Sequence, residues 1–272
     1  MEMRLDVKDA TFAYKGNEYV FEGLTFSVRE GDLLSILGPN GCGKTTLVKC
    51  LCGMLDLKEG EILLNGKDIR SLKTIDIAKN IGYIAQEHDP TFPYTVLEVV
   101  LMGRAPHLGW FSLPSEKDIK IAEEALELVG ISHLKNRPYT EISGGERQLT
   151  LIARFLAQQP KILLMDEPTS HLDLKNRIFI LETARKFADD GFCVIMTTHL
   201  PNQALNYSNR IILMGKEKAI AVGSVEEVMT EENLSKAYGV DIRILSVNDQ
   251  DGNEMRLCIP VKCGKGVVWD DA

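Results

Sequence analysis

The chain has no long hydrophobic run, which excludes a helix that crosses a membrane. Its apolar stretches, such as Ile162–Met165 and Leu33–Leu37, hold four or five residues, whereas a spanning helix needs about 20. The first residues, Met1–Asp6, lack the apolar core of a secretory signal peptide. We therefore expect a protein of the cytosol, or one that lies on a membrane surface without entering it.

Positive charge is also scarce. The 272 residues include 31 Lys and Arg against 39 Asp and Glu, so the formal net charge is −8. A nucleic-acid-binding surface needs clustered cations to neutralise phosphates, and we expect no nucleic-acid partner. With 44% hydrophobic and 26% charged residues, the composition is typical of a soluble globular protein.

Cysteine pairs with the spacing of a zinc site or a disulfide framework are absent. The six cysteines are scattered, and Cys50 and Cys52 lie in a segment of helical character. Cys258 and Cys263 leave open a metal or redox site, but no second ligand pair accompanies them. Buried thiols in a reducing compartment are the favoured interpretation.

The chain does contain a phosphate-binding loop. The apolar run Leu33–Leu37 breaks into a glycine-rich segment that satisfies the pattern G-x-x-x-x-G-K-[ST]. Its glycines let backbone N–H groups turn toward phosphate oxygens, and the following helix directs its positive dipole end at them. Lys44 would hold the terminal phosphates, and Thr45 would offer a hydroxyl to Mg²⁺. The predicted phosphate-binding residues are Gly38, Pro39, Asn40, Gly41, Cys42, Gly43, Lys44, Thr45 and Thr46.

Two carboxylates close a second apolar strand. Asp166 and Glu167 directly follow Ile162–Met165, and the carboxyl ends of strands are where sites form in α/β proteins. Asp166 is suited to the Mg²⁺ shell and Glu167 to polarising an attacking water. Capping of the strand at the surface is the alternative, but the phosphate loop upstream favours the catalytic role.

The rest of the chain mixes strands and helices. Asn65-Gly66 after the strand Glu61–Leu64 indicates a tight turn. Residues 96–157 are helical in character, and their amphipathic helix has Ser115 and Asp118 as a cap and Gly130 as a stop. The predicted strands are Arg4–Val7, Thr11–Tyr14, Leu24–Val28, Asp32–Leu37, Glu61–Leu64, Ile81–Ala85, Lys161–Met165, Phe192–Thr197 and Arg210–Met214, and a tail hairpin of Ile242–Val247 and Met255–Ile259. Helices predicted near Thr74–Asn80 and at Leu174–Asp189 and Pro201–Tyr207 alternate with strands, which favours a parallel sheet buried on both faces.

A third motif indicates the family. Residues 142–148 read Ile-Ser-Gly-Gly-Glu-Arg-Gln and precede a helix whose N-terminus can bind an anion. The segment resembles the signature motif, usually Leu-Ser-Gly-Gly-Gln, of ATP-binding-cassette (ABC) ATPases, and the resemblance extends over about residues 3–240. Ile142 and Glu146 depart from the usual pattern. Glu146 either places a carboxylate near the nucleotide or points away from it.

The resemblance implies roles for several residues. Tyr14 corresponds to the aromatic residue that stacks on adenine, and His199 to the switch histidine at the γ-phosphate. Residues 170–173, Ser-His-Leu-Asp, correspond to the D-loop. The implied catalytic residues are Glu167, His199 and Gln86, the last from the Q-loop. The implied Mg²⁺ ligands are Thr45, Gln86 and Asp166, and ATP would be bound by Tyr14 and the phosphate loop. The signature residues Ser143, Gly144, Gly145 and Glu146 would serve the nucleotide of another subunit, and Asp173 would belong to the D-loop.

The resemblance also implies the fold. We expect an α/β ABC ATPase with a P-loop core built on a mixed, largely parallel sheet, an antiparallel β subdomain and an inserted α-helical subdomain. The ATPase domain would cover residues 3–240, with a RecA-like core at about 3–90 and 158–240 and the helical subdomain at about 91–157. Residues 241–272 would form a small C-terminal β extension.

Two segments indicate which type of ABC transporter the chain would serve. Thr95–His107 and Pro114–Asp118 look like the ATPases of importers for iron–siderophore, haem, cobalamin and oxyanions such as molybdate, although Val96–Met102 also fits a plain amphipathic helix. The resemblance implies ATP and Mg²⁺ as cofactors and a head-to-tail homodimer. It further implies two integral-membrane permease subunits, a periplasmic or extracellular substrate-binding protein, and a peripheral location on the cytoplasmic face of the cell membrane. The alternative is a soluble ABC ATPase outside transport, such as the iron–sulfur assembly type.

Overall fold

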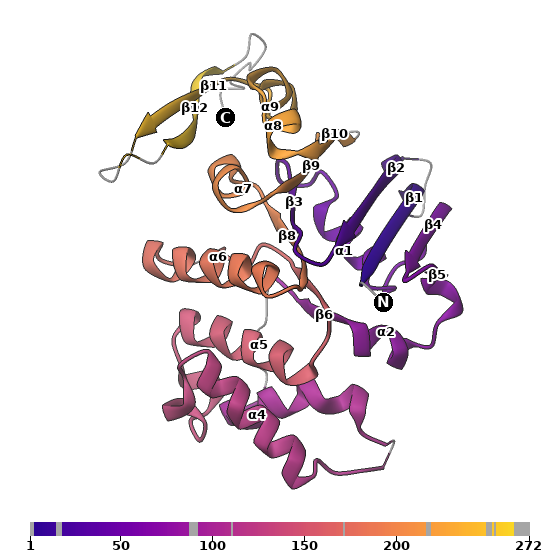
Figure 1. Ribbon diagram of the computed structural model, residues 1–272, viewed down its shortest axis with the longest axis vertical. Helices are drawn as coiled ribbons and strands as arrows, with labels where there is room; N and C mark the ends of the chain where they lie inside the picture. Colours follow the sequence, from indigo (N-terminus) through magenta and orange to yellow (C-terminus); the bar gives the residue numbers. More distant parts are fainter. Residues whose placement is uncertain are drawn as a thin grey trace, which may run out of the picture.

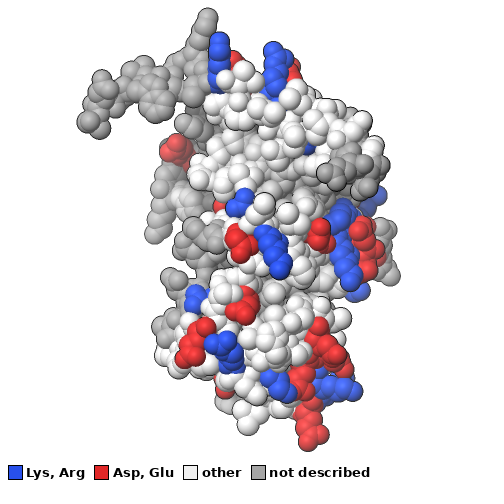
Figure 2. Space-filling view, turned by 90° about the vertical axis from the view of Figure 1, so that its left-hand side faces the viewer, with Lys and Arg blue, Asp and Glu red and all other residues white. Residues whose placement is uncertain are grey.

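The structure, a computed structural model, describes residues 3–14, 18–86, 92–109, 111–170, 172–215, 219–248, 252 and 254–263. Figure 1 shows a small antiparallel sheet beside a central sheet, a block of helices at one end and a β-hairpin at the other. On the face seen in Figure 2, the described acidic and basic side chains are interspersed rather than separated by sign. Among the described residues, no helix combines the length and apolar character that crossing a bilayer requires.

The small sheet contains strands in the order β2-β1-β4-β5, paired antiparallel. The sequence analysis was wrong to divide residues 4–14 into two strands. They form a single strand with irregular pairing, because Asp9 takes a left-handed φ of 48° and bulges where Gly60 packs closely against its backbone. The predicted turn at Asn65-Gly66 is confirmed, with φ of 51° and 79°. The elements are β1 (Arg4–Ala13), β2 (Tyr19–Arg29), β4 (Glu59–Leu64), β5 (Lys67–Asp68) and the short η1 (Ile69–Ser71).

The central sheet has the strand order β10-β9-β3-β8-β7-β6. All its strands pair in parallel except β10, which is antiparallel to β9. The predicted parallel core is confirmed, and β3, β7 and β8 are buried along their whole length. The strands are β3 (Leu33–Leu37), β6 (Ile81–Ile84), β7 (Ile162–Met165), β8 (Cys193–Thr198), β9 (Arg210–Met214) and β10 (Ala219–Ser224), and the helices joining them include α1 (Lys44–Leu51), α2 (Thr74–Asn80), α6 (Leu174–Asp189) and α7 (Pro201–Tyr207).

The helical block leaves the central sheet after β6 and returns at β7, and it forms the lower part of Figure 1. The predicted cap of α4 is confirmed, since Ser115 and Asp118 bond reciprocally through their side chains and backbone N–H groups. Gly130 follows this helix with a φ of 76°. A buried ion pair of 2.9 Å between Arg104 and Asp118 ties the block together. Its elements are α3 (Val96–Leu101), η2 (Met102–His107), α4 (Glu116–Leu128), η3 (Ser132–Leu134), η4 (Tyr139–Glu141) and α5 (Gly144–Gln158).

The C-terminal part packs on the β9–β10 end of the central sheet. The predicted hairpin is confirmed and is longer than expected, comprising β11 (Val240–Asn248) and β12 (Glu254–Cys263). Two helices before it, α8 (Val225–Val228) and α9 (Glu231–Tyr238), were not predicted. A separate apolar cluster joins these helices to α7 and to Ile242 and Cys258 of the hairpin.

Candidate functional site

The phosphate loop joins β3 to α1, and its glycines are required by geometry. Gly41 and Gly43 adopt φ of 80° and 100°, which side chains other than glycine rarely tolerate. A Cβ at Gly38 would collide with the carbonyl oxygen of Met214, and a Cβ at Gly43 would collide with Val20. No described side chain caps the N-terminus of α1, so its first N–H groups are available to an anion.

Lys44 lies buried inside the loop, with only 5% of its surface exposed. Its ammonium group donates to the carbonyl oxygens of Gly38 and Pro39, each at 3.0 Å. It also forms an ion pair of 3.3 Å with a carboxylate oxygen of Glu167. The phosphate loop and the end of β7, more than 100 residues apart in sequence, are thereby brought to one point.

An open cavity of about 550 Å³ lies over the loop. Tyr14 stands at its side, 55% exposed, with its ring edge-on to Phe12 and its hydroxyl 3.0 Å from that of Thr46. Cys42, although part of the loop, points into the core. The described residues that line the cavity are Tyr14, Val20, Asn40, Gly41, Gly43, Lys44, Thr45, Thr46, Gln86 and Glu167.

Glu167 is the centre of the site. One carboxylate oxygen pairs with Lys44, and the other accepts from Ser170 at 3.0 Å, His199 Nδ1 at 3.1 Å and Gln86 at 3.4 Å. Burial opposes ionisation, but Lys44, Ser170 and His199 outweigh it and hold the pKa of Glu167 below its ordinary value. Its backbone is left-handed, with a φ of 44°, a conformation that costs a non-glycine residue about 1–3 kcal/mol and is common at functional sites.

Asp166 is almost completely buried beside it, at 1% exposure. The Thr197 hydroxyl donates to Asp166 at 2.7 Å and accepts from the backbone N–H of Glu167, also at 2.7 Å. Tyr83 donates to the other oxygen of Asp166 at 3.5 Å. Burial and the nearby Asp166 carboxylate raise the pKa of Tyr83 well above its ordinary value, so this hydroxyl keeps its proton.

The donor set of the site fits a magnesium ion. Mg²⁺ prefers oxygen ligands and is commonly held by one or two protein oxygens together with phosphates and water. The Thr45 hydroxyl lines the cavity and has no hydrogen-bond partner among the described residues, and Asp166 retains acceptor sites beyond its two bonds. No group of three or more His, Cys, Asp and Glu side chains among the described residues could hold a metal without such phosphate oxygens.

The signature segment forms the start of α5. Ser143 caps the helix by accepting from the backbone N–H of Glu146 at 3.3 Å, and the Glu146 carboxylate accepts from the backbone N–H of Ser143 at 2.7 Å. These bonds hold the pKa of Glu146 below its ordinary value. The acid that replaces the usual glutamine is therefore turned back onto its own loop.

The signature does not join the phosphate loop within one chain. None of the described residues lining the cavity belongs to Ser143–Glu146. The signature lies instead beside the start of α6, next to the D-loop. Gly145 packs so closely there that a Cβ on it would meet the side chain of Asn176. Asn176 in turn bonds Asp173, the residue that caps α6, through its backbone N–H at 2.8 Å and its side chain at 3.0 Å. The predicted D-loop residue His171 lies outside the described residues.

Sequence reasoning missed Thr197 and Asn176, and it placed Ser170 in the D-loop without predicting its bond to Glu167. Thr197, Ser170 and Asn176 bond to Asp166, Glu167 and Asp173. Two signals were available, since Thr197 lies near the end of β8, the strand next to β7, and Ser170 stands three residues after Glu167.

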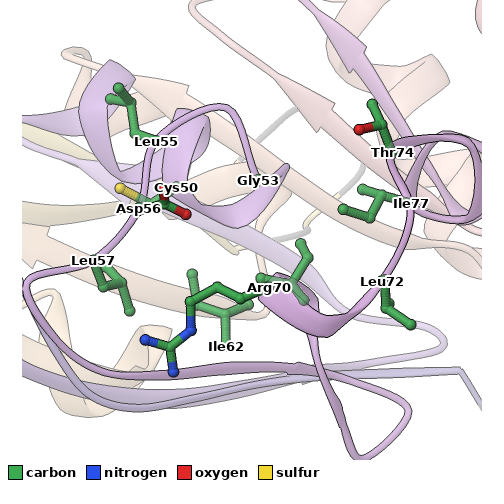
Figure 3. A pocket seen from close by; sticks show the side chains of 11 residues that line it. Cys50, Gly53, Leu55, Asp56, Leu57, Ile62, Arg70, Leu72, Thr74 and Ile77 are labelled. Atoms are coloured by element: carbon green, nitrogen blue, oxygen red, sulfur yellow. The ribbon is translucent and has the colours of Figure 1, made fainter.

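A second cavity, of about 150 Å³, lies beyond the end of α1 (Figure 3). Its wall combines aliphatic side chains such as Leu57 and Ile62 with the polar side chains of Asp56 and Arg70. Burial raises the pKa of the Cys50 thiol in its wall to about 12, so this thiol is protonated at neutral pH. The residues around this cavity are not those of the phosphate loop.

Comparison with known proteins identifies the family of the chain. The ABC transporter family model matches residues 21–170. A Helicobacter pylori strain J99 protein assigned to iron chelatin transport as its ATP-binding protein is 39% identical, covering 91% of this chain and 98% of its own. The Haemophilus influenzae molybdate import ATP-binding protein is 36% identical, covering 88% and 89%.

Comparison with solved structures points to the same family. A chain from an ABC transporter assigned to the metal-chelate type, in an inward-facing conformation, aligns with a TM-score of 0.86 and 33% identity. The alignment covers 95% of this chain and 98% of that one. The phosphate loop, the paired carboxylates and the signature thus occur in a chain that belongs to the ATP-binding proteins of ABC transporters, a family that hydrolyses ATP.

Proposed function

We propose that this chain is the ATP-hydrolysing subunit of an importer for a metal chelate and that it works as a head-to-tail homodimer. The observation that carries the proposal is the split between two half-sites. Glu167 faces the phosphate-loop cavity, whereas Ser143–Glu146 lies outside it, beside the D-loop. A second copy, related by a two-fold axis, would supply the missing half to each cavity.

In this proposal each residue around the cavity has a defined task. Tyr14 stacks on adenine, the loop N–H groups and Lys44 bind phosphates, and Glu167 orients the attacking water. Gln86 and His199, both bonded to Glu167, would act at the γ-phosphate. Thr45, Asp166 and Gln86 would hold Mg²⁺, which when bound neutralises charge on the phosphates.

Two relatives and one solved structure support the class of cargo. Their names concern iron chelatin, molybdate and a metal-chelate type of transporter. We therefore propose cargo such as an iron(III)–siderophore, haem, cobalamin or a related oxyanion, carried by two membrane permease subunits and delivered to them by a periplasmic or extracellular binding protein. The chain would lie peripherally on the cytoplasmic face, with residues 3–240 as the ATPase domain and 241–272 as the extension.

The homodimer is tested by Glu167→Gln, which keeps the shape of the side chain and removes its charge. Without the carboxylate, hydrolysis should fall by about 10²–10⁴-fold, and the ATP-bound dimer should accumulate. Light scattering with Mg²⁺ and excess ATP measures the mass. Glu127→Gln, on the exposed side of α4, is the matched control, and its ATP hydrolysis and mass should equal those of the wild type. A Glu167→Gln protein that remains monomeric at saturating ATP would refute the head-to-tail scheme.

Transport is tested separately from hydrolysis. The tagged chain should co-purify with its membrane subunits, and ATP turnover of the reconstituted complex should rise when a binding protein loaded with one of these chelates is added. Parallel assays with iron(III)–siderophore, haem, cobalamin and molybdate identify the cargo. ATP turnover with no membrane partner and no response to any cargo would favour the soluble iron–sulfur assembly alternative.

A further inference from the structure

Tyr238 connects the C-terminal part of the chain to the site. Tyr238 is the last residue of α9, and its hydroxyl donates to the backbone carbonyl of His199 at 3.0 Å. His199 in turn bonds Glu167 through its ring at 3.1 Å. A continuous path of two hydrogen bonds therefore joins α9 to the catalytic carboxylate.

His199 needs such an anchor because packing does not hold its ring. The imidazole is 38% exposed, and its bond to Glu167 is its one side-chain hydrogen bond to the described residues. The residue lies between the end of β8 and the start of α7. On the following residue the backbone N–H of Leu200 donates to the Thr198 hydroxyl at 3.1 Å. The direction of the ring thus depends on the backbone, which Tyr238 holds at the carbonyl.

Tyr238 is itself held in place. Gly239 ends α9 with a φ of 68°, and Thr230 caps its start. Tyr238 is half-buried, and burial is the main reason why its pKa lies well above its ordinary value. A phenol hydroxyl that is shielded from water is stabilised by a hydrogen-bond partner, and the carbonyl of His199 supplies it.

The β-hairpin braces this arrangement from two sides. The backbone N–H of Ile242 donates to Ser235 of α9 at 3.0 Å. Asn202, three residues after His199, accepts from the backbone N–H of Cys258 at 2.6 Å and donates to its carbonyl at 3.3 Å. Both α9 and the start of α7 are therefore fastened to the same hairpin, as their neighbouring places in Figure 1 show.

We propose that Tyr238 is a positioning residue for ATP hydrolysis, which acts by holding the His199 backbone so that its ring meets Glu167. This inference rests on the proposed roles of His199 and Glu167. It assigns to the C-terminal part of the chain a direct task in hydrolysis, in addition to any packing role.

The first test is Tyr238→Phe, which deletes one hydroxyl and keeps the ring. In the complex with its membrane subunits, kcat should fall about fivefold, the value of one net hydrogen bond, while KM for ATP stays within about twofold because the phosphate loop is untouched. Tyr207→Phe is the matched control, since this half-buried residue of α7 has no hydrogen bond to a described site residue. Equal kcat in wild type and Tyr238→Phe, or a fall shared by Tyr207→Phe, would overturn the proposal.

The second test asks whether the effect passes through His199. In a double-mutant cycle with His199→Ala, Tyr238→Phe should have almost no additional effect. The imidazole signals of the chain, ¹³C-labelled at its five histidines, should shift at His199 alone in Tyr238→Phe. Independent effects in the cycle, together with an unmoved His199 signal, would refute the inference. Absence of hydrolysis in the wild-type complex would refute the proposed function instead, and the histidine spectrum would still report on Tyr238.

Discussion

Replacing Thr197 by Val should damage stability and hydrolysis together. The Thr197 side chain is fully buried, and its hydroxyl bonds both the Asp166 carboxylate and the backbone N–H of Glu167, each at 2.7 Å. Valine has nearly the same shape but no hydroxyl, so the change removes both bonds without opening a cavity. The Asp166 carboxylate and the backbone N–H of Glu167 then each lose this partner, although Tyr83 still bonds Asp166.

The size of the effect follows from these two bonds. A hydrogen bond to a charged group contributes about 1.5–3 kcal/mol, and an unsatisfied buried N–H costs about 1–3 kcal/mol. Tyr83 continues to bond Asp166, which reduces the loss. We therefore expect the free energy of unfolding to fall by about 3 kcal/mol. For a chain of this size that corresponds to a Tm lower by about 6–12 °C.

Urea denaturation followed by circular dichroism measures the stability, and steady-state ATP turnover measures the function. Thr197→Ser keeps the hydroxyl and serves as the control, with a loss below about 1.5 kcal/mol from the missing methyl. In Thr197→Val, kcat should fall at least about tenfold because both carboxylates lose their alignment. A Val variant as stable and as active as the Ser variant would refute the role assigned to this hydroxyl.

The remaining predictions concern Glu146 and Cys50. The pKa of Glu146 is lowered in the folded chain by its bonds to Ser143, so its stabilising effect is present above the unfolded pKa and is lost as the pH falls through the folded value. Glu146→Gln should retain ATP turnover and lower Tm at pH 7, with a difference that shrinks as the pH falls below about 4.3, the ordinary pKa of glutamate; a difference independent of pH would contradict this. Cys50, whose pKa burial raises to about 12, should resist iodoacetamide at pH 8 until urea unfolds the chain, as mass spectrometry can show. Rapid labelling in the native state would be the contrary result.

The sequence predicted those parts of the site that are contiguous. The residues of the phosphate loop are contiguous in sequence, and so are Asp166 and Glu167, so both motifs can be recognised without a structure. The cap of Ser115 with Asp118 is readable for the same reason. The parallel core was predictable because its strands are continuously apolar.

The parts that were missed depend on contacts across the fold. Thr197 and Tyr238 meet Asp166 and His199 only after segments 31 and 39 residues apart have packed together, and threonine and tyrosine are too common to signal such a role. The helix α8 has four residues, too few to show a period, and β10 is a half-exposed edge strand. The roles of the site residues in hydrolysis remain predictions, for which the experiments above are designed.

The way the helical block is attached has a further consequence. The chain leaves the sheet at the carboxyl end of β6 and re-enters at the amino end of β7, an adjacent parallel strand. Just before β7, Gln158 donates to the carbonyl of Ile81, at the start of β6, at 2.9 Å. The return of the helical block is thus fixed to the neighbouring strand, so the length and surface of the helices between the two strands can vary without moving the strands. Such a junction allows the helical block to change in evolution while the sheet stays the same. The residues around the phosphate-loop cavity can then stay the same while the surface of the helical block changes.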